Sequence, residues 1–167
     1  MSTLPTNYWR NHRGGATLIE LVISVLVLGI LAAVAAPVYS NSLLRYQVEL
    51  AAQRITQDVV QAQRAARQRN SNCIITFDLN SDSYSISGLT SLDRASQAYT
   101  VVVNSSPYNV DIVALATASQ PNTPLSTVAV AFNRFGMPDD GASITVRAGT
   151  FDKRIDIAPI TGRASVQ

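Results

Sequence analysis

The feature that most constrains this chain is an apolar block close to its N-terminus. Between Leu21 and Ala36 the only side chain with a polar group is Ser24. Together with residues 16–19 the block reaches roughly 20 residues, the length that a helix needs to cross a bilayer. Residues 1–15 ahead of it hold two arginines and no acid. Because retained positive charge orients a first membrane helix, the pattern predicts a single-pass anchor with a cytoplasmic N-terminus and an exported remainder.

One ionisable residue, Glu20, lies inside this apolar block. A carboxylate at such a position costs roughly 3 kcal/mol on insertion scales. Two interpretations stay open from this residue alone. Glu20 is a functional group that needs its charge in the membrane, or it is protonated or reaches the interface from one turn inside the helix.

From residue 38 onward the apolar side chains become periodic. No Gly or Pro occurs in residues 38–69, and apolar residues recur at steps of three or four, as on one face of an α-helix. We therefore expect one helix from near Ala16 to near Arg69. Residues 16–37 are apolar all round, and residues 38–70 form an amphipathic continuation that lies against a sheet. The expected buried stripe is Leu44, Val48, Ala51, Ile55, Val59, Ala62 and Ala66, and the expected wet face is Arg45, Glu49, Gln53, Arg54, Asp58, Gln61, Arg64, Arg67 and Gln68.

The remaining residues, 71–167, read as an exported antiparallel β-sheet domain. Short runs of alternating apolar residues are separated by turns rich in Gly, Pro, Asn and Asp, which is typical of an antiparallel meander. The fold class is therefore α+β. The expected strands are at Cys73–Leu79, Tyr84–Ile86, Tyr99–Val103, Val110–Leu115, Val128–Phe132, Ile144–Val146 pairing with Ile155–Ile157 across Ala148–Lys153, and Arg163–Val166.

Residue inventory argues against an enzyme and against a cofactor. The single histidine, His12, lies in the basic segment at the start of the chain, and the single cysteine, Cys73, lies in a strand-like run where a small core residue is expected. No Ser-His-Asp or Cys-His arrangement can be built. Asp139 and Asp140 are adjacent in a glycine-bounded turn, where local hydrogen bonding is the simpler interpretation and a calcium site the alternative.

The start of the apolar block resembles the leader junction of type IV pilins and type II secretion pseudopilins. It reads Arg13-Gly14-Gly15-Ala16-Thr17-Leu18-Ile19-Glu20-Leu21. The resemblance implies that residues 1–15 are a leader recognised through Arg13 and Gly14. It also implies that a prepilin peptidase cleaves between Gly15 and Ala16, and that Ala16 is then N-methylated. Ala16 departs from the Phe or Met that the family usually has there.

The same resemblance assigns filament-assembly roles to Glu20 and Pro37. After cleavage these become the fifth and twenty-second residues, where the family carries a glutamate and commonly a proline. The resemblance implies that Glu20 pairs with the N-terminal amine of a neighbouring subunit, because a buried charge is costly unless it is paired. Pro37 removes a helical hydrogen bond, so it either loosens the helix during assembly or only kinks it at the membrane boundary.

Over most of its length the chain resembles the GspH/FimT family of minor pseudopilins and minor pilins. The marks are an Ala/Arg-rich helix end at Ala62–Arg67, a Phe-x-x-x-Gly turn at Phe132–Gly136, and the pair Gly162-Arg163 before a last strand. The resemblance implies a structural subunit of a type II secretion pseudopilus or type IV pilus that acts in filament initiation, tip assembly or protein secretion. Its implied partners are other pilin-like subunits, the prepilin peptidase/methyltransferase, the bacterial inner membrane and a secreted substrate.

Two other functions remain open. DNA-binding members of the family carry Gly-Arg-x-Arg near the C-terminus, which would make Gly162 and Arg163 DNA contacts in a transformation receptor. This chain lacks the second arginine, and residues 71–167 hold six basic and eight acidic residues, which disfavours phosphate binding. Arg64, Arg67 and Arg69 complement the helix dipole or form a phosphate patch. Alternatively, the A-x-A pattern at Ala33–Ala35 would let signal peptidase release a soluble protein.

Overall fold

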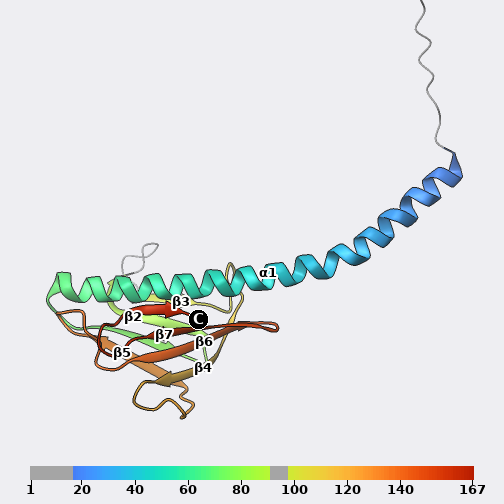
Figure 1. The fold of residues 1–167 in the computed structure, drawn as a ribbon. Helices are drawn as coiled ribbons and strands as arrows, with labels where there is room; N and C mark the ends of the chain where they lie inside the picture. The colour runs from blue at the N-terminus through green and yellow to red at the C-terminus, as the bar shows by residue number, and fades with distance from the viewer. Residues whose placement is uncertain (1–16, 91–97) are drawn as a thin grey trace, which may run out of the picture. The chain divides into compact units, whose positions relative to one another are not determined.

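The computed structural model describes residues 17–90 and 98–167, so the predicted leader 1–15 and Ala16 lie outside the described residues. The chain divides into two compact units, Met1–Ser40 and Asn41–Gln167. The elements are α1 (Leu18–Arg69), β1 (Cys73–Asp78), β2 (Ser83–Thr90), β3 (Ala98–Val102), β4 (Asp111–Thr117), β5 (Thr127–Phe132), β6 (Ala142–Ala148), β7 (Phe151–Ile157) and β8 (Ala164–Val166) (Figure 1).

Helix α1 ends in a Schellman motif. Asn70 adopts a left-handed conformation with φ of 50°, which asparagine tolerates better than most residues. The amide of Asn70 donates to the Arg67 carbonyl at 3.4 Å, and the amide of Ser71 donates to the Ala66 carbonyl at 3.3 Å. These are the two hydrogen bonds of that motif. These hydrogen bonds end the helix before Asn70, and the chain then continues into β1.

The second half of α1 packs on the strands through the predicted apolar stripe. Six of its seven residues are buried and Leu44 is half-buried, so the helical period was correctly assigned. The predicted wet face contains one error. Asp58 is only 3% exposed and is the one buried charged side chain among the described residues.

The strands form two four-stranded sheets, with orders β3-β2-β1-β5 and β4-β6-β7-β8. Every pairing is antiparallel. The predicted strands are all present, but the predicted meander is wrong in two places. Strand β5 returns to pair with β1, aligning Cys73 with Phe132, and β4 pairs with β6 instead of with β3 or β5. Local patterning did not reveal these long-range pairings, because it reports which residues alternate and not which strands meet.

The β6–β7 hairpin is tighter than expected. The two strands pair as predicted, but the register differs from the one that a turn at Ala148–Lys153 would give. Ile144 faces Ile155 and Val146 faces Lys153, so the strands continue to a two-residue turn at Gly149-Thr150. A side-chain carbon at Gly149 would lie 2.9 Å from Leu44 of α1. A glycine is needed there because the turn lies against the helix and φ is 59°.

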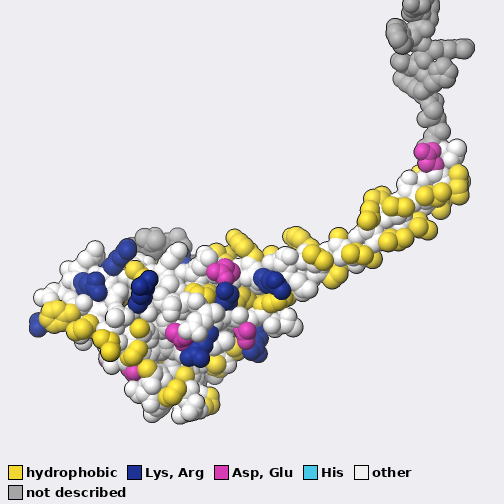
Figure 2. All heavy atoms as spheres, in the orientation of Figure 1, with side chains coloured by type: hydrophobic (Ala, Val, Ile, Leu, Met, Phe, Trp, Pro, Cys, Tyr) yellow, Lys and Arg dark blue, Asp and Glu magenta, His cyan; other side chains and the backbone are white. Residues whose placement is uncertain are grey.

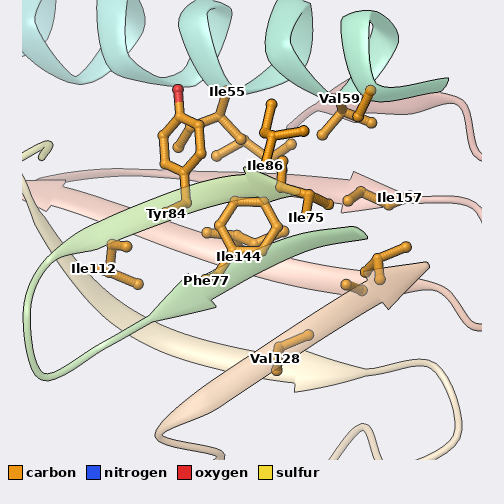
Figure 3. Packing of buried hydrophobic residues seen from close by; sticks show 14 of the residues in the cluster. Ile55, Val59, Ile75, Phe77, Tyr84, Ile86, Ile112, Val128, Ile144 and Ile157 are labelled. Atoms are coloured by element: carbon orange, nitrogen blue, oxygen red, sulfur yellow. The ribbon is translucent and has the colours of Figure 1, made fainter. Parts of the chain in front are cut away.

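One hydrophobic core lies between α1 and the sheets. Figure 3 shows side chains from α1 and from both sheets pointing into a common interior, among them Ile55 from the helix, Phe77 from one sheet and Ile144 from the other. Every buried hydrophobic residue of the described chain falls between Val48 and Ile157. The unit Asn41–Gln167 therefore contains this entire core, and we expect it to fold as an independent domain.

Candidate functional site

The apolar N-terminal part of α1 has no core of its own to cover it. The large apolar side chains from Leu18 to Val38 are 47–83% exposed in the single chain, and Figure 2 shows them lining this part of the helix. The helix is long enough and apolar enough to cross a membrane, with none of its most apolar window buried. An exposed apolar surface of this size marks a membrane or protein contact.

Glu20 lies in the first turn of α1. The Thr17 hydroxyl accepts a hydrogen bond from the Glu20 amide at 3.3 Å, which makes Thr17 the N-cap and Thr17-Leu18-Ile19-Glu20 a capping-box sequence. A carboxylate in the first turn is also favoured by the helix dipole. Sequence analysis did not use this capping signal, although Thr followed three residues later by Glu would have placed the helix start.

Pro37 lies inside α1, which continues through it from Leu18 to Arg69. The ring removes one amide donor from the helix, and the Ser40 hydroxyl donates to the Pro37 carbonyl at 3.1 Å. The proposed loosening of the helix at Pro37 during assembly stays a prediction.

A buried polar cluster on the second half of α1 was missed by sequence reasoning. The Asp58 carboxylate accepts hydrogen bonds from the hydroxyls of Tyr84 at 2.6 Å and Tyr99 at 2.8 Å. It also pairs with Arg54 one turn earlier, Nε to Oδ2 at 3.1 Å, and Arg54 donates to the Tyr99 hydroxyl. Figure 3 shows the Tyr84 hydroxyl directed at the helix. The cluster fixes β2 and β3 to the helix with directional contacts.

The protonation states of the cluster follow from its burial. Burial, together with the adjacent Asp58 carboxylate, raises the pKa of Tyr84 well above its ordinary value. Burial and the Asp58 hydrogen bond raise the pKa of Tyr99 to about 12. For Arg54, burial alone would lower the pKa, but the Asp58 charge and the Tyr99 hydrogen bond raise it instead. The phenols therefore stay protonated donors, and Arg54 stays a cation. The cluster stabilises the fold.

The three sequence marks of the domain meet at the C-terminal end of α1. Gln63 donates through Nε2 to the carbonyl of Gly136 at 2.7 Å and to that of Thr161 at 2.9 Å. Arg67 donates to the Phe135 carbonyl at 3.0 Å. The helix end therefore holds two turns, residues 133–138 and residues 158–163, side by side. This junction explains both the Phe-x-x-x-Gly turn at Phe132–Gly136 and the pair Gly162-Arg163.

Gly162 is required by the junction for steric reasons. It is buried with φ of 66°, and a side-chain carbon there would lie 2.8 Å from the Phe132 ring and 3.0 Å from Gln63. Tight packing inside the domain therefore explains why position 162 is a glycine, without a role in DNA binding. Arg163, the other predicted DNA contact, is exposed beside it, together with Arg64, Arg67 and Arg69 at the helix end.

The adjacent aspartates between β5 and β6, Asp139 and Asp140, accept hydrogen bonds from backbone amides. Asp139 accepts from the Ala131 amide at 2.9 Å, and Asp140 accepts from the Gly141 amide at 2.7 Å and the Ser119 amide at 3.3 Å. Local hydrogen bonding therefore accounts for both carboxylates. Over residues 17–90 and 98–167, no three His, Cys, Asp or Glu side chains group as metal ligands.

Cys73 is buried in β1, as predicted, and burial raises the pKa of its thiol. A raised thiol pKa lowers the fraction of reactive thiolate. Cys73 is therefore a core residue.

Comparison with known proteins supports the interpretation of the N-terminus. Residues 10–36 match the family model described as the prokaryotic N-terminal methylation motif. The match contains the predicted cleavage junction and Glu20. The motif and the apolar helix that follows it fit a membrane-anchored pilin-like protein. No curated protein sequence matches the chain.

Three solved structures resemble the chain over most of its length. The minor pilin FimU of Pseudomonas aeruginosa matches in two crystal forms at 12% identity, with TM-scores of 0.45 and 0.48, over 71% and 74% of this chain and 91% and 90% of FimU. The minor pseudopilin EpsH of the Vibrio cholerae Type 2 Secretion System matches at 10% identity and a TM-score of 0.48, over 72% of this chain and 96% of EpsH. All three TM-scores lie below 0.5.

Proposed function

We propose that this chain, whose N-terminal motif and fold are those of a type IV pilin-like protein, is a minor pilin or minor pseudopilin. It is a structural subunit that acts in filament initiation or at the tip of a type IV pilus or type II secretion pseudopilus. The observation that carries the proposal is the combination of a methylation motif at residues 10–36 with an exposed apolar helix directly behind it.

The subunit is first a single-pass protein of the bacterial inner membrane, with residues 1–15 in the cytoplasm and the β-sheet domain in the periplasm. Its arginine-bearing leader sets this orientation. Prepilin peptidase cleaves between Gly15 and Ala16, because a glycine before the cut lets the backbone enter a protease cleft without a side-chain clash. Methylation of the new terminus at Ala16 follows.

Cleavage makes assembly favourable by creating a cation close to Glu20. In the sequence the new terminal amine is four residues ahead of that carboxylate. In a filament the exposed apolar segment packs against the same segment of other subunits, and Glu20 pairs with a neighbour's amine. Removing one partner of such a buried pair leaves an uncompensated charge, so the pairing penalises a wrong register. Pro37 supplies the point at which the helix can loosen.

The decisive experiment is mass spectrometry of the mature N-terminus in a cell that makes prepilin peptidase. We expect a chain that begins at Ala16 and carries one added methyl group. The Gly15→Ala variant should keep its leader, because a side chain is placed at the cleavage junction, whereas Thr3→Ala, far from the junction, should mature normally. A chain that begins near residue 36 would replace this proposal with cleavage by signal peptidase.

A further inference from the structure

An exposed apolar surface lies where α1 ends. Phe135, Met137 and Ile160 are 62%, 46% and 78% exposed, and they stand on the two turns that Gln63 ties together. Figure 2 shows hydrophobic side chains gathered at this end of the domain with Lys or Arg side chains beside them. Because the turns are fixed by hydrogen bonds to the helix, this surface is preorganised and ordering it costs little on binding.

The same end is strongly basic. The segments that form it, residues 59–77, 129–138 and 157–167, contain five arginines and no acid. In the part of the chain that the structure describes, the four ion pairs involve other residues. The neighbouring Asp139 and Asp140, which accept hydrogen bonds from backbone amides, offset two of these five positive charges and leave a basic surplus. We call this surface the arginine end: Phe135, Met137, Ile160, Arg64, Arg67, Arg69, Arg134 and Arg163.

The opposite end of the same domain carries the complementary chemistry. The β1–β2 turn and the start of β4 hold Asp78, Asp82 and Asp111, beside Val102 and Val113, which are 44% and 36% exposed. Asp82 joins these elements, accepting from the amide of Ile112 at 2.7 Å. We call this surface the aspartate end: Asp78, Asp82, Asp111, Val102 and Val113.

Strand register places the two surfaces at opposite ends of both sheets. In one sheet Cys73 faces Phe132 and Asp78 faces Thr127; in the other Asp111 faces Arg147 and Thr117 faces Ala142. The strands between are about 20 Å long at ~3.3 Å per residue. Among the basic side chains near the aspartate end, Arg147 pairs with Asp152 at 3.1 Å and Lys153 pairs with Glu49 at 3.0 Å. Arg45, which lies over the Phe151 ring at 4.6 Å, is one basic side chain against the three aspartates. Each end therefore keeps a surplus of its own sign.

From these observations we infer that the arginine end of one copy of this chain docks on the aspartate end of a second copy, head to tail. Two unlike, complementary surfaces on one subunit make a heterologous contact, and such contacts generate helical filaments when they do not close into a ring. The inference deepens the proposed function, on which it rests: it says which periplasmic surfaces meet when two copies follow each other in the filament. Opposite charges guide the approach and set the register, and the apolar side chains exclude water at the centre.

The test uses the full chain in detergent micelles with a photo-crosslinking benzoylphenylalanine in place of Ile160. We expect copy-to-copy adducts whose second peptide lies in residues 78–83 or 102–113. The double variant Arg134→Glu/Arg163→Glu should lower the adduct yield at least tenfold, and Asp111→Arg should lower it severalfold. Mixing the two variants should restore the adduct between unlike copies, because the charges are exchanged. Raising the salt from about 50 mM to about 1 M should weaken the adduct, as the screening length falls to about 3 Å.

Gln57→Glu is the matched control, since it adds negative charge on an exposed helix face away from both ends and should leave the yield unchanged. Adducts that join two arginine ends, or that survive the charge reversal, would overturn the inference. Salt-sensitive binding of double-stranded DNA that the same reversal abolishes, without copy-to-copy adducts, would reassign the surface to nucleic acid. Cleavage at Gly15 and membrane anchoring are scored separately in the cells that produce the chain, before detergent extraction, so the inference can fail while the proposed function stands.

Discussion

Replacing Asp58 by alanine should be among the most damaging single changes in the domain. The carboxylate is 3% exposed and accepts from the hydroxyls of Tyr84 and Tyr99 at 2.6 and 2.8 Å. An alanine leaves both hydroxyls without their acceptor, and a buried polar group that loses its partner costs about 1–3 kcal/mol.

The loss of Arg54 pairing adds little to this sum. The Arg54 side chain is 39% exposed, so water can solvate the guanidinium once the carboxylate is gone. A partly exposed ion pair of this kind contributes up to about 1 kcal/mol to the free energy of unfolding. The two hydroxyls and this small electrostatic contribution together predict a loss of about 3–5 kcal/mol in the free energy of unfolding, the range seen when a buried pair is broken. At a few degrees per kcal/mol for a domain of this size, the midpoint should fall by about 10–20 °C.

The assay is thermal and urea unfolding of residues 41–167, followed by circular dichroism. Gln57→Ala, the neighbouring exposed position, is the control and should change stability by less than about 0.5 kcal/mol. A double-mutant cycle with Tyr84→Phe should show coupling, since the two groups share a hydrogen bond. If Asp58→Ala costs less than about 1 kcal/mol, the cluster does not hold β2 and β3 to the helix, and the reasoning is refuted.

Three further predictions concern Tyr99 of the same cluster, Gly162 and Glu20. Stability of residues 41–167 should hold up to about pH 10, the ordinary pKa of tyrosine, and then decline as the pH rises through the folded pKa of about 12 for Tyr99. The reason is that the native state keeps a proton which the unfolded state releases first. Urea unfolding at several alkaline pH values checks this, and a Tyr99→Phe variant should lose less stability over that interval. Gly162→Ala should cost roughly 2–3 kcal/mol, because it combines a left-handed backbone with a contact of 2.8 Å to Phe132; a melting point within a degree of wild type would contradict this. Glu20→Ala should leave leader cleavage intact but reduce incorporation into sheared filaments at least tenfold, with Ser24→Ala as the control, and normal incorporation would remove the pairing role from Glu20.

Much of the fold could be predicted from local patterns. Steps of three and four placed the buried stripe of α1 because a helix repeats its faces every 3.6 residues, and period-two alternation located the strands. The N-terminal motif could also be recognised from the sequence, since the predicted leader junction and Glu20 both lie within the matched residues 10–36. Such features are decided by residues close together in the chain.

Three features depended on residues far apart in the chain. Asp58 was assigned to the wet face because its spacing fits that face, and its burial depends on two tyrosines that lie 26 and 41 residues away. The return of β5 to β1 and the partition into two sheets are long-range pairings without a local signal. Gly136 and Gly162 were seen as turn residues, and only their contacts with α1 explain why no larger residue fits.

The sequence by itself therefore determined where the apolar block lies, which stretch is one helix and where the strands lie, because hydrophobic periodicity acts over a few residues. The tertiary structure alone decided which strands pair, which charge is buried and how the two turns meet at the helix end. It also segregated surplus arginines from surplus aspartates at opposite ends of the domain. Those outcomes arise when segments tens of residues apart compete for the same partners, and that competition is resolved only in the packed fold.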